Sequence, residues 1–135
     1  MTESSSKADD LRFTVKPGAI ELFCFSAATW NPHRIHYDTD YARNIEGHPD
    51  VIVPGPMQGA WLLELADGWA ESQNLEVSDI EYRNILPAFA NRELTVGARP
   101  TMTDNGVRLE VWVDDSEHRL CIGTVNLRKK QGFHP

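Results

Sequence analysis

Apolar and polar residues alternate through most of the second half of the chain. From 107 to 113, valine or leucine stands at every second position, which turns one face of a strand toward a core. The same kind of pattern predicts four strands, over 77–86, 92–103, 106–114 and 119–129. Turn-forming residues at Asp104–Gly106 and Asp114–Glu117 are typical of hairpin connections, so the last three strands are expected to form an antiparallel meander.

The first half of the chain has a different pattern. The apolar run Ile20–Phe25 predicts a short strand, and the polar segment after it predicts a loop that ends where Asp38 caps a short helix. Pro56 then stands where the first turn of a helix tolerates proline. Behind it, apolar residues at helical spacing predict a mostly buried helix, through Met57, Ala60, Trp61, Leu62, Leu63, Leu65, Ala66 and Trp69.

These elements predict an α+β architecture. One buried helix followed by an antiparallel meander indicates a curled antiparallel β-sheet wrapped around one central helix. The chain has 135 residues, of which 41% are apolar, enough for one hydrophobic core. We therefore expect a single domain over 13–135, behind a Ser-rich disordered tail over 1–12.

The charge of the chain limits its partners. A net charge of −7 argues against general nucleic-acid binding, which requires a surface of Lys and Arg to displace counterions from phosphates. The first residues contain no apolar signal-peptide core, and no run approaches the ~18 apolar residues of a membrane span. We expect a cytoplasmic protein that contacts small molecules or other proteins.

Candidate chemistry is concentrated in eight residues, NPHRIHYD, at Asn31–Asp38. A histidine such as His36 moves protons near neutral pH, and Gly55 stands at the start of the predicted helix, where free backbone N–H groups favour an oxyanion. The spacing alone favours a loop histidine that caps a turn over a catalytic one. His33, His36 and His48 match no common zinc spacing, so no metal site is expected.

The wider segment resembles the MaoC-like dehydratases and R-specific enoyl-CoA hydratases, which have the hot-dog fold. Their motif is Asp-x-Asn-Pro-x-His-x-Asp-x-x-Tyr-Ala, and IHYDTDYA places His36 on its histidine and Asp38 on its second aspartate. VPGPM is similar to the family's Val-His-Gly-Met turn, with Gly55 on the glycine. FSAATWNPHRIHYD and IEYRNILPAF look closer to the branch of mesaconyl-CoA hydratase and type 2 hydroxyacyl-thioester dehydratase.

The resemblance implies hydration of a 2-enoyl-CoA thioester to a 3-hydroxyacyl-CoA, or the reverse dehydration. His36 is then the catalytic base and the Gly55 N–H the oxyanion donor. Asn31 falls where the family has a catalytic aspartate; its amide orients water but takes no proton. Trp30, Arg34 and Met57 are expected to contact substrate. Asp38 and His33 are expected to hold the catalytic residues in position without contacting substrate. No cofactor is expected beyond the coenzyme A of the substrate.

Two other functions are compatible with the same residues. A hot-dog thioesterase would hydrolyse the thioester instead, and a non-catalytic subunit would complete the site of a catalytic partner. The resembled families close their substrate tunnel with a second hot-dog unit, and several members of the branch are doubled chains. We therefore expect a homodimer, or a heteromer with a second hot-dog chain.

Overall fold

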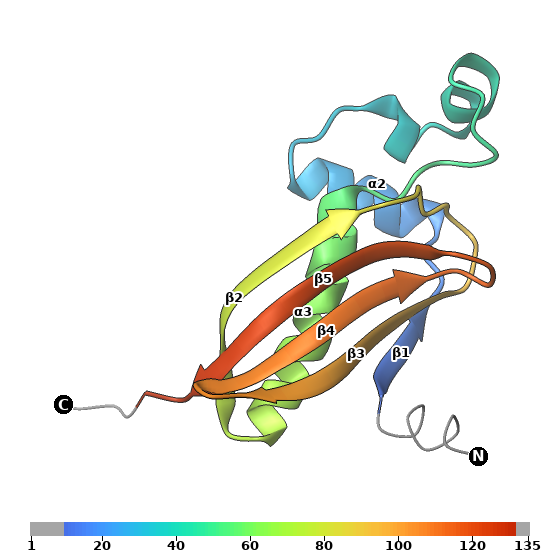
Figure 1. Cartoon of the computed structure of the whole chain (residues 1–135). Helices are drawn as coiled ribbons and strands as arrows, with labels where there is room; N and C mark the ends of the chain where they lie inside the picture. Colours follow the sequence, from blue (N-terminus) through green and yellow to red (C-terminus); the bar gives the residue numbers. More distant parts are fainter. Residues whose placement is uncertain (1–9, 132–135) are drawn as a thin grey trace.

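The computed structural model describes residues 10–131, which contain one antiparallel sheet, two α-helices and two short helical turns (Figure 1). The elements in chain order are β1 (Leu11–Val15), α2 (Ala19–Ala28), the 3-10 turn η1 (Arg34–His36), the π-helical turn η2 (Tyr41–Ile45), α3 (Gly55–Ser72), β2 (Leu75–Asn84), β3 (Leu94–Thr103), β4 (Gly106–Asp114) and β5 (Arg119–Lys129).

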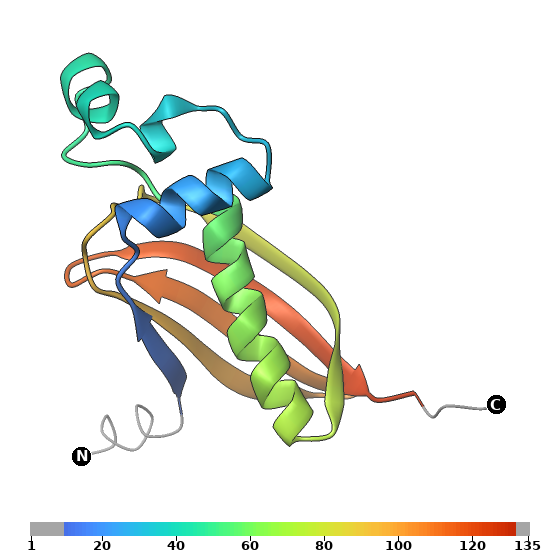
Figure 2. The same ribbon diagram turned by 180° about the vertical axis from the view of Figure 1, so that it is seen from behind.

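The five strands are ordered β1-β3-β4-β5-β2, and all neighbours pair antiparallel. The helix α3 crosses one face of this sheet, as Figure 2 shows from behind. The predicted α+β architecture and the four predicted strands are thereby confirmed, with bounds that differ by no more than two residues. β2 and β1 are the two edges, so along β2 one side of the backbone has no strand partner within the described residues.

The alternation that predicted β4 is confirmed by burial. Val107, Leu109, Val111 and Val113 are all buried, and Val111 and Val113 pair with the buried Ala98 and Val96 of β3. Both predicted hairpins are present, since β3 pairs with β4 and β4 with β5 through their short turns. In β3 to β5, the turn residues and the alternation of apolar and polar residues predict the same strands.

The central helix is less buried than the sequence predicts. The face that packs on the sheet repeats every four residues, through Gln58, Leu62, Ala66 and Ala70. By contrast, Ala60 lies exposed and Leu63 is 40% exposed. The prediction that these two residues are buried is wrong for the single chain, because the sheet covers only one side of α3.

Two N-terminal predictions are corrected. The run Ile20–Phe25 lies in the helix α2, with Leu22 and Ser26 buried one turn apart, and Glu21 accepting a hydrogen bond from the Gly18 N–H at 3.4 Å. A segment of six residues, five of them apolar, cannot by itself distinguish a strand from a helix. The strand β1 was not predicted, and its first two residues shorten the predicted disordered tail, while residues 1–9 lie outside the described part of the chain.

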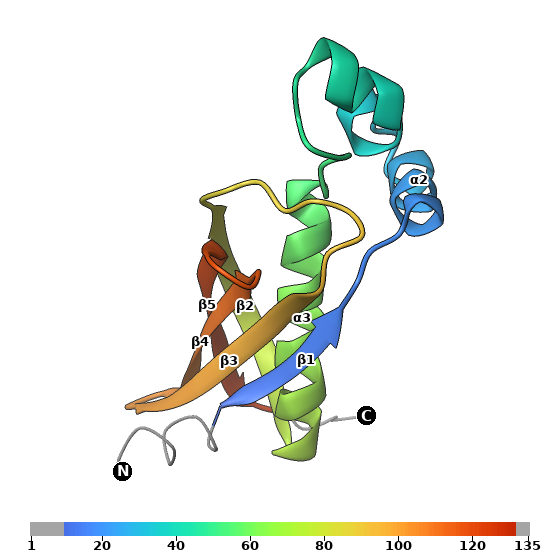
Figure 3. The same cartoon turned by 90° about the vertical axis from the view of Figure 1, so that its right-hand side faces the viewer.

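The polar segment lies at one end of the molecule. α2 and residues 34–45 lie beyond the N-terminal end of α3, as the side view shows (Figure 3). The chain then returns through Val51 and Val53, both buried, into Gly55 at the start of α3. This path brings the sequence's candidate chemistry to the end of the central helix.

Candidate functional site

His36 is held by a backbone carbonyl. Its Nδ1 lies 2.7 Å from the carbonyl oxygen of Ile52. A carbonyl oxygen only accepts, so Nδ1 carries the hydrogen and donates it. The second ring nitrogen, Nε2, is left with its lone pair. The fold therefore sets the tautomer in which Nε2 of the neutral ring is a base.

The surroundings keep His36 neutral near pH 7. Partial burial lowers the pKa of His36 below its usual value, and the nearby His33 lowers that pKa further, while the bond to the Ile52 carbonyl opposes the shift. The rings of His33 and His36 lie edge to face with centroids 5.7 Å apart. His33 thus acts on the candidate base through its charge.

Gly55 is connected to His36 through Ile52. It follows Ile52, the hydrogen-bond partner of His36, by three residues, which span at most about 10 Å. Gly55 is the first residue of α3, behind the N-cap Pro54. Its N–H has no carbonyl partner within the helix and is available to an anion.

A cavity of about 240 Å³ adjoins Gly55. Val53, Gly55, Gln58 and Asn84 line it, together with residues 85–87 after β2. A side chain added at Gly55 would collide with the Asn84 amide nitrogen, so that amide lies directly over the glycine. Sequence reasoning missed Gln58 and Asn84; the available signal was a polar residue on the apolar stripe of a helix.

A second cavity, of about 390 Å³, lies on the α2 side of the loop. Phe23, Trp30, Asn31 and Tyr37 line it with mostly apolar surface. Trp30 is 92% exposed and has a left-handed backbone, at φ 53°. The structure thus brings two of the predicted site residues, Trp30 and Asn31, to one apolar groove.

Two hydrogen bonds of Asn31 hold the loop, one through its backbone N–H and one through its side-chain oxygen. The Asn31 N–H donates to the Ser26 carbonyl at 2.9 Å, and the Asn31 Oδ1 accepts from the His33 N–H at 3.2 Å. The side-chain amide nitrogen makes no hydrogen bond within residues 10–131. Asn31 therefore turns the chain from α2 into the histidine segment and keeps a donor free.

Arg34 and Asp38 form an ion pair with each other. The Arg34 Nη2 lies 3.0 Å from the Asp38 Oδ2, and the guanidinium stacks 4.3 Å from the centre of the Tyr41 ring. Asp38 also accepts from the Tyr41 N–H at 3.1 Å, which confirms the predicted cap. The Tyr41 N–H first, and then Arg34, lower the pKa of Asp38. Arg34 is thus engaged locally, and Met57 is buried in the core without lining the Gly55 cavity.

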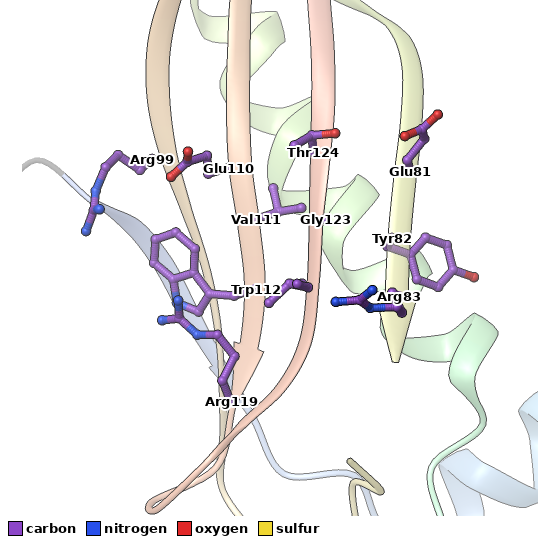
Figure 4. Close-up of a pocket in the computed structure, with 11 residues that line it drawn as sticks. Glu81, Tyr82, Arg83, Arg99, Glu110, Val111, Trp112, Arg119, Gly123 and Thr124 are labelled. Carbon is purple, nitrogen blue, oxygen red and sulfur yellow. The ribbon is translucent and has the colours of Figure 1, made fainter. Parts of the chain in front are cut away.

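The most voluminous of the described cavities, about 540 Å³, lies on the outer face of the sheet (Figure 4). Trp112 packs there between Arg119 and Arg99, whose guanidinium carbons lie 4.7 and 5.6 Å from its ring centre. These arginines pair with Asp114 and Asp10. The charges in this cavity largely neutralise one another, and none of the predicted site residues lines it.

Comparison with known proteins identifies relatives of this chain. The profile of the family described as hydroxyacyl-thioester dehydratase type 2 matches residues 1–90. The chain is 37% identical to the mesaconyl-C(4)-CoA hydratase of Chloroflexus aurantiacus over 76% of its length and 34% of that protein. It is 29% identical to the mitochondrial hydroxyacyl-thioester dehydratase type 2 of Schizosaccharomyces pombe, over 73% of its length and 30% of that protein. The chain thus spans about a third of each curated relative.

Solved structures show the same fold. An (R)-hydratase from A. caviae involved in PHA biosynthesis superposes with a TM-score of 0.79 at 18% identity, over 90% of this chain and 94% of that one. A chain of the ChsH1-ChsH2 complex of Mycobacterium tuberculosis gives 0.78 at 18% identity, over 90% and 95%. The hot-dog fold is thereby confirmed. None of the helices within residues 10–131 has the length and apolar character that a membrane crossing needs.

Proposed function

Because this chain belongs to the hydroxyacyl-thioester dehydratase type 2 family of MaoC-like hot-dog proteins, we propose that it hydrates a 2-enoyl-CoA to a 3-hydroxyacyl-CoA, or catalyses the reverse dehydration. The family acts on acyl thioesters. One observation carries the assignment to this chain: the bond from His36 Nδ1 to the carbonyl of Ile52, three residues before the start of α3, leaves Nε2 as a base.

The proposed chemistry uses His36 and Gly55 together. The oxygen of a water molecule bonds to C3 of the enoyl group while Nε2 of His36 takes the proton of that water. The electron pair of the double bond moves toward the thioester oxygen, whose negative charge the Gly55 N–H stabilises. C2 then takes a proton from the protonated His36, so one water has been added and the thioester is intact.

Asn31 supports this step without taking a proton. Its amide has no acidic or basic group at neutral pH, so it orients the water or the acyl group through hydrogen bonds. The apolar groove that it shares with Trp30 fits an acyl chain. We assign Trp30 to acyl contact, and Arg34 and Asp38 to holding the loop on which His36 stands.

Coenzyme A is the preferred carrier in this proposal. The relative from Chloroflexus aurantiacus is, by its name, a hydratase of a CoA thioester. An acyl carrier protein is itself acidic, and the net charge of −7 on this chain disfavours its approach. A CoA thioester carries its negative charge on a small nucleotide that needs only a local binding site.

A second hot-dog unit is proposed to close the site. The edge strand β2 leaves ten residues of backbone without a strand partner on one side in the described chain. Large apolar side chains are exposed beside it, with Tyr82 at 39%, Ile85 at 45% and Leu63 at 40%. Unpaired edges and exposed apolar groups favour association. We propose a homodimer or a heteromer with a second hot-dog chain; two of the structural neighbours belong to such assemblies, the ChsH1-ChsH2 and HadBC complexes of Mycobacterium tuberculosis.

The products distinguish this proposal from a thioesterase. With a 2-enoyl-CoA in water, we expect the absorbance of the enoyl-thioester band to fall while the concentration of free thiol stays constant. A thiol-reactive dye that develops colour in step with substrate loss would favour hydrolysis instead. The non-catalytic alternative predicts neither change for the chain alone.

The pH dependence of the rate reports on the neutral form of His36. A base must be unprotonated, and burial and His33 lower the pKa of His36 below about 6.5. We therefore expect kcat/KM to fall on the acid side, with the midpoint of that fall below pH 6.5. His33→Gln removes the neighbouring charge and should raise the pKa, moving this fall to higher pH. A fall centred above 6.5 in the unmodified protein would contradict the assignment.

A further inference from the structure

Gln58 is a polar residue on the buried face of α3. Its side chain is 2% exposed, and its Oε1 has no hydrogen-bond partner in the described structure. The residues that follow it on the same face, Leu62, Ala66 and Ala70, are all apolar. A buried amide oxygen without a partner destabilises the folded chain. A group retained at such a cost needs a role that the core does not supply.

The Gln58 side chain lines the cavity beside Gly55. Gln58 stands three residues after Gly55, about one helical turn along α3. The remaining lining is mostly apolar, apart from Asn84, whose amide nitrogen lies over Gly55. The cavity of about 240 Å³ is thus lined by the oxyanion donor of the proposed reaction and by Gln58, whose buried Oε1 is an unused acceptor. Nothing in the catalytic step derived above uses that acceptor.

The Gln58 oxygen lacks a hydrogen-bond donor, which a substrate in the adjoining cavity could supply. A carbonyl oxygen accepts and cannot donate, so a thioester oxygen or an alkyl chain leaves it unsatisfied. A hydroxyl group supplies the donor. When the thioester oxygen lies at the Gly55 N–H, C3 is only two bonds from the thioester carbon, so a hydroxyl on C3 lies within one helical turn of that point.

We propose that Gln58 binds the 3-hydroxyl of the 3-hydroxyacyl thioester through its Oε1, and in the hydration direction holds the incoming water in the same place. This inference rests on the proposed function and adds a positioning residue to it. Gln58 is neutral and takes no proton, which remains with His36. Asn31 stands in the place of an aspartate and holds water less strongly than an aspartate would. The Gln58 amide thereby supplies part of the missing interaction with water.

A cycle of two ligands and two proteins, with and without Gln58→Met, tests the inference, and a third protein serves as the control. The ligands are 3-hydroxybutyryl-CoA and butyryl-CoA, which differ by the hydroxyl alone, and binding is measured by calorimetry. All proteins carry His36→Ala, so that the ligands are not converted. Gln58→Met keeps the length of the side chain and removes its amide. Gln73→Met, on an exposed glutamine at the far end of α3, is the matched control.

With Gln58 present, we expect 3-hydroxybutyryl-CoA to bind about tenfold more tightly than butyryl-CoA. Gln58→Met should abolish this preference, mainly by weakening the hydroxylated ligand, and Gln73→Met should retain it. Because the amide has no partner in the free protein, Gln58→Met should not lower the melting temperature. A purely structural amide would lower it and leave the preference unchanged.

An equal preference with and without the Gln58→Met substitution would overturn the inference and leave the proposed hydration untouched. An unmodified protein that hydrates no enoyl-CoA, yet shows the full ligand cycle, would defeat the proposed function and retain the hydroxyl contact. Failure of both ligands to bind either protein would defeat both. The two ideas are therefore separable by the same set of proteins.

Discussion

Replacing His36 with alanine is expected to lower kcat for enoyl-CoA hydration by about two to four powers of ten. The loss follows because the fold commits Nδ1 to the Ile52 carbonyl and leaves Nε2 as the base. His36 is not part of the hydrophobic core cluster, so the far-ultraviolet circular dichroism should be unchanged. The measurement is the initial rate at saturating substrate for the purified variant.

A matched control for this variant is His118→Ala. His118 lies exposed in the turn between β4 and β5, where its N–H donates to Asp115 at 2.6 Å. This position is at a surface turn outside the cavities beside Gly55 and Asn31. His118→Ala should keep the full rate. Equal rates for the His36 variant and its control would remove His36 from the mechanism.

Gly55→Pro is expected to lower kcat by about two to three powers of ten, because it deletes the backbone N–H that stabilises the thioester oxygen. Proline is tolerated at the first position of a helix, where its missing N–H has no helical partner. The preceding Pro54 already has the extended backbone that a following proline favours, at ψ 138°. The helix should therefore begin at the same residue, and KM should change less than kcat.

The steric part of this substitution is measured separately. Gly55→Ala adds a side chain at the same place and retains the N–H, and its β-carbon would displace the Asn84 amide. Asn84→Ala in combination with either variant relieves that contact. We expect Gly55→Ala/Asn84→Ala to be far more active than Gly55→Pro/Asn84→Ala. Similar rates for these two double variants would mean that the N–H of residue 55 stabilises no charge.

The sheet could be predicted from the sequence because its signals are local. The period of two in β4 and the turn residues at Asp104–Gly106 both act within a few residues, and they agree with each other. The edge strand β1 has no such support. Its five residues alternate, but their partner in β3 is more than eighty residues away in sequence for all but the last pair. A pairing of that range is decided by the complete core and not by the segment itself.

In the histidine segment, too, local contacts could be predicted from the sequence and long-range contacts could not. The motif predicted that His36 is the catalytic base, and that role stays a prediction. The cap at Asp38 was predicted from the local pattern, because a cap depends only on neighbouring residues. The motif did not predict the Ile52 carbonyl that sets the tautomer of His36, because that contact joins residues sixteen positions apart. Arg34 was predicted to contact substrate, and the structure pairs it with Asp38 one helical turn away.

Spacing could mark Gln58 as a polar residue on the apolar face of α3, but it could not show that Gln58 and Asn84 share a cavity. One lies on α3 and the other at the end of β2, and only the packing of the helix on the sheet brings them to one cavity with Gly55. Similarly, Leu63 belongs to the apolar pattern of α3 but is exposed in the single chain. An apolar pattern reports that a side chain avoids water and leaves open whether its own chain or a second one covers it.

The most direct test of the central claim is to run the reaction in ¹⁸O-labelled water and locate the label by mass spectrometry. The account predicts that the unmodified protein places one ¹⁸O on C3 of a CoA thioester that remains intact, and that the His36→Ala protein places almost none there in the same time. Label in the carboxylate of a released acid, accompanied by free coenzyme A, would contradict the account and identify a thioesterase.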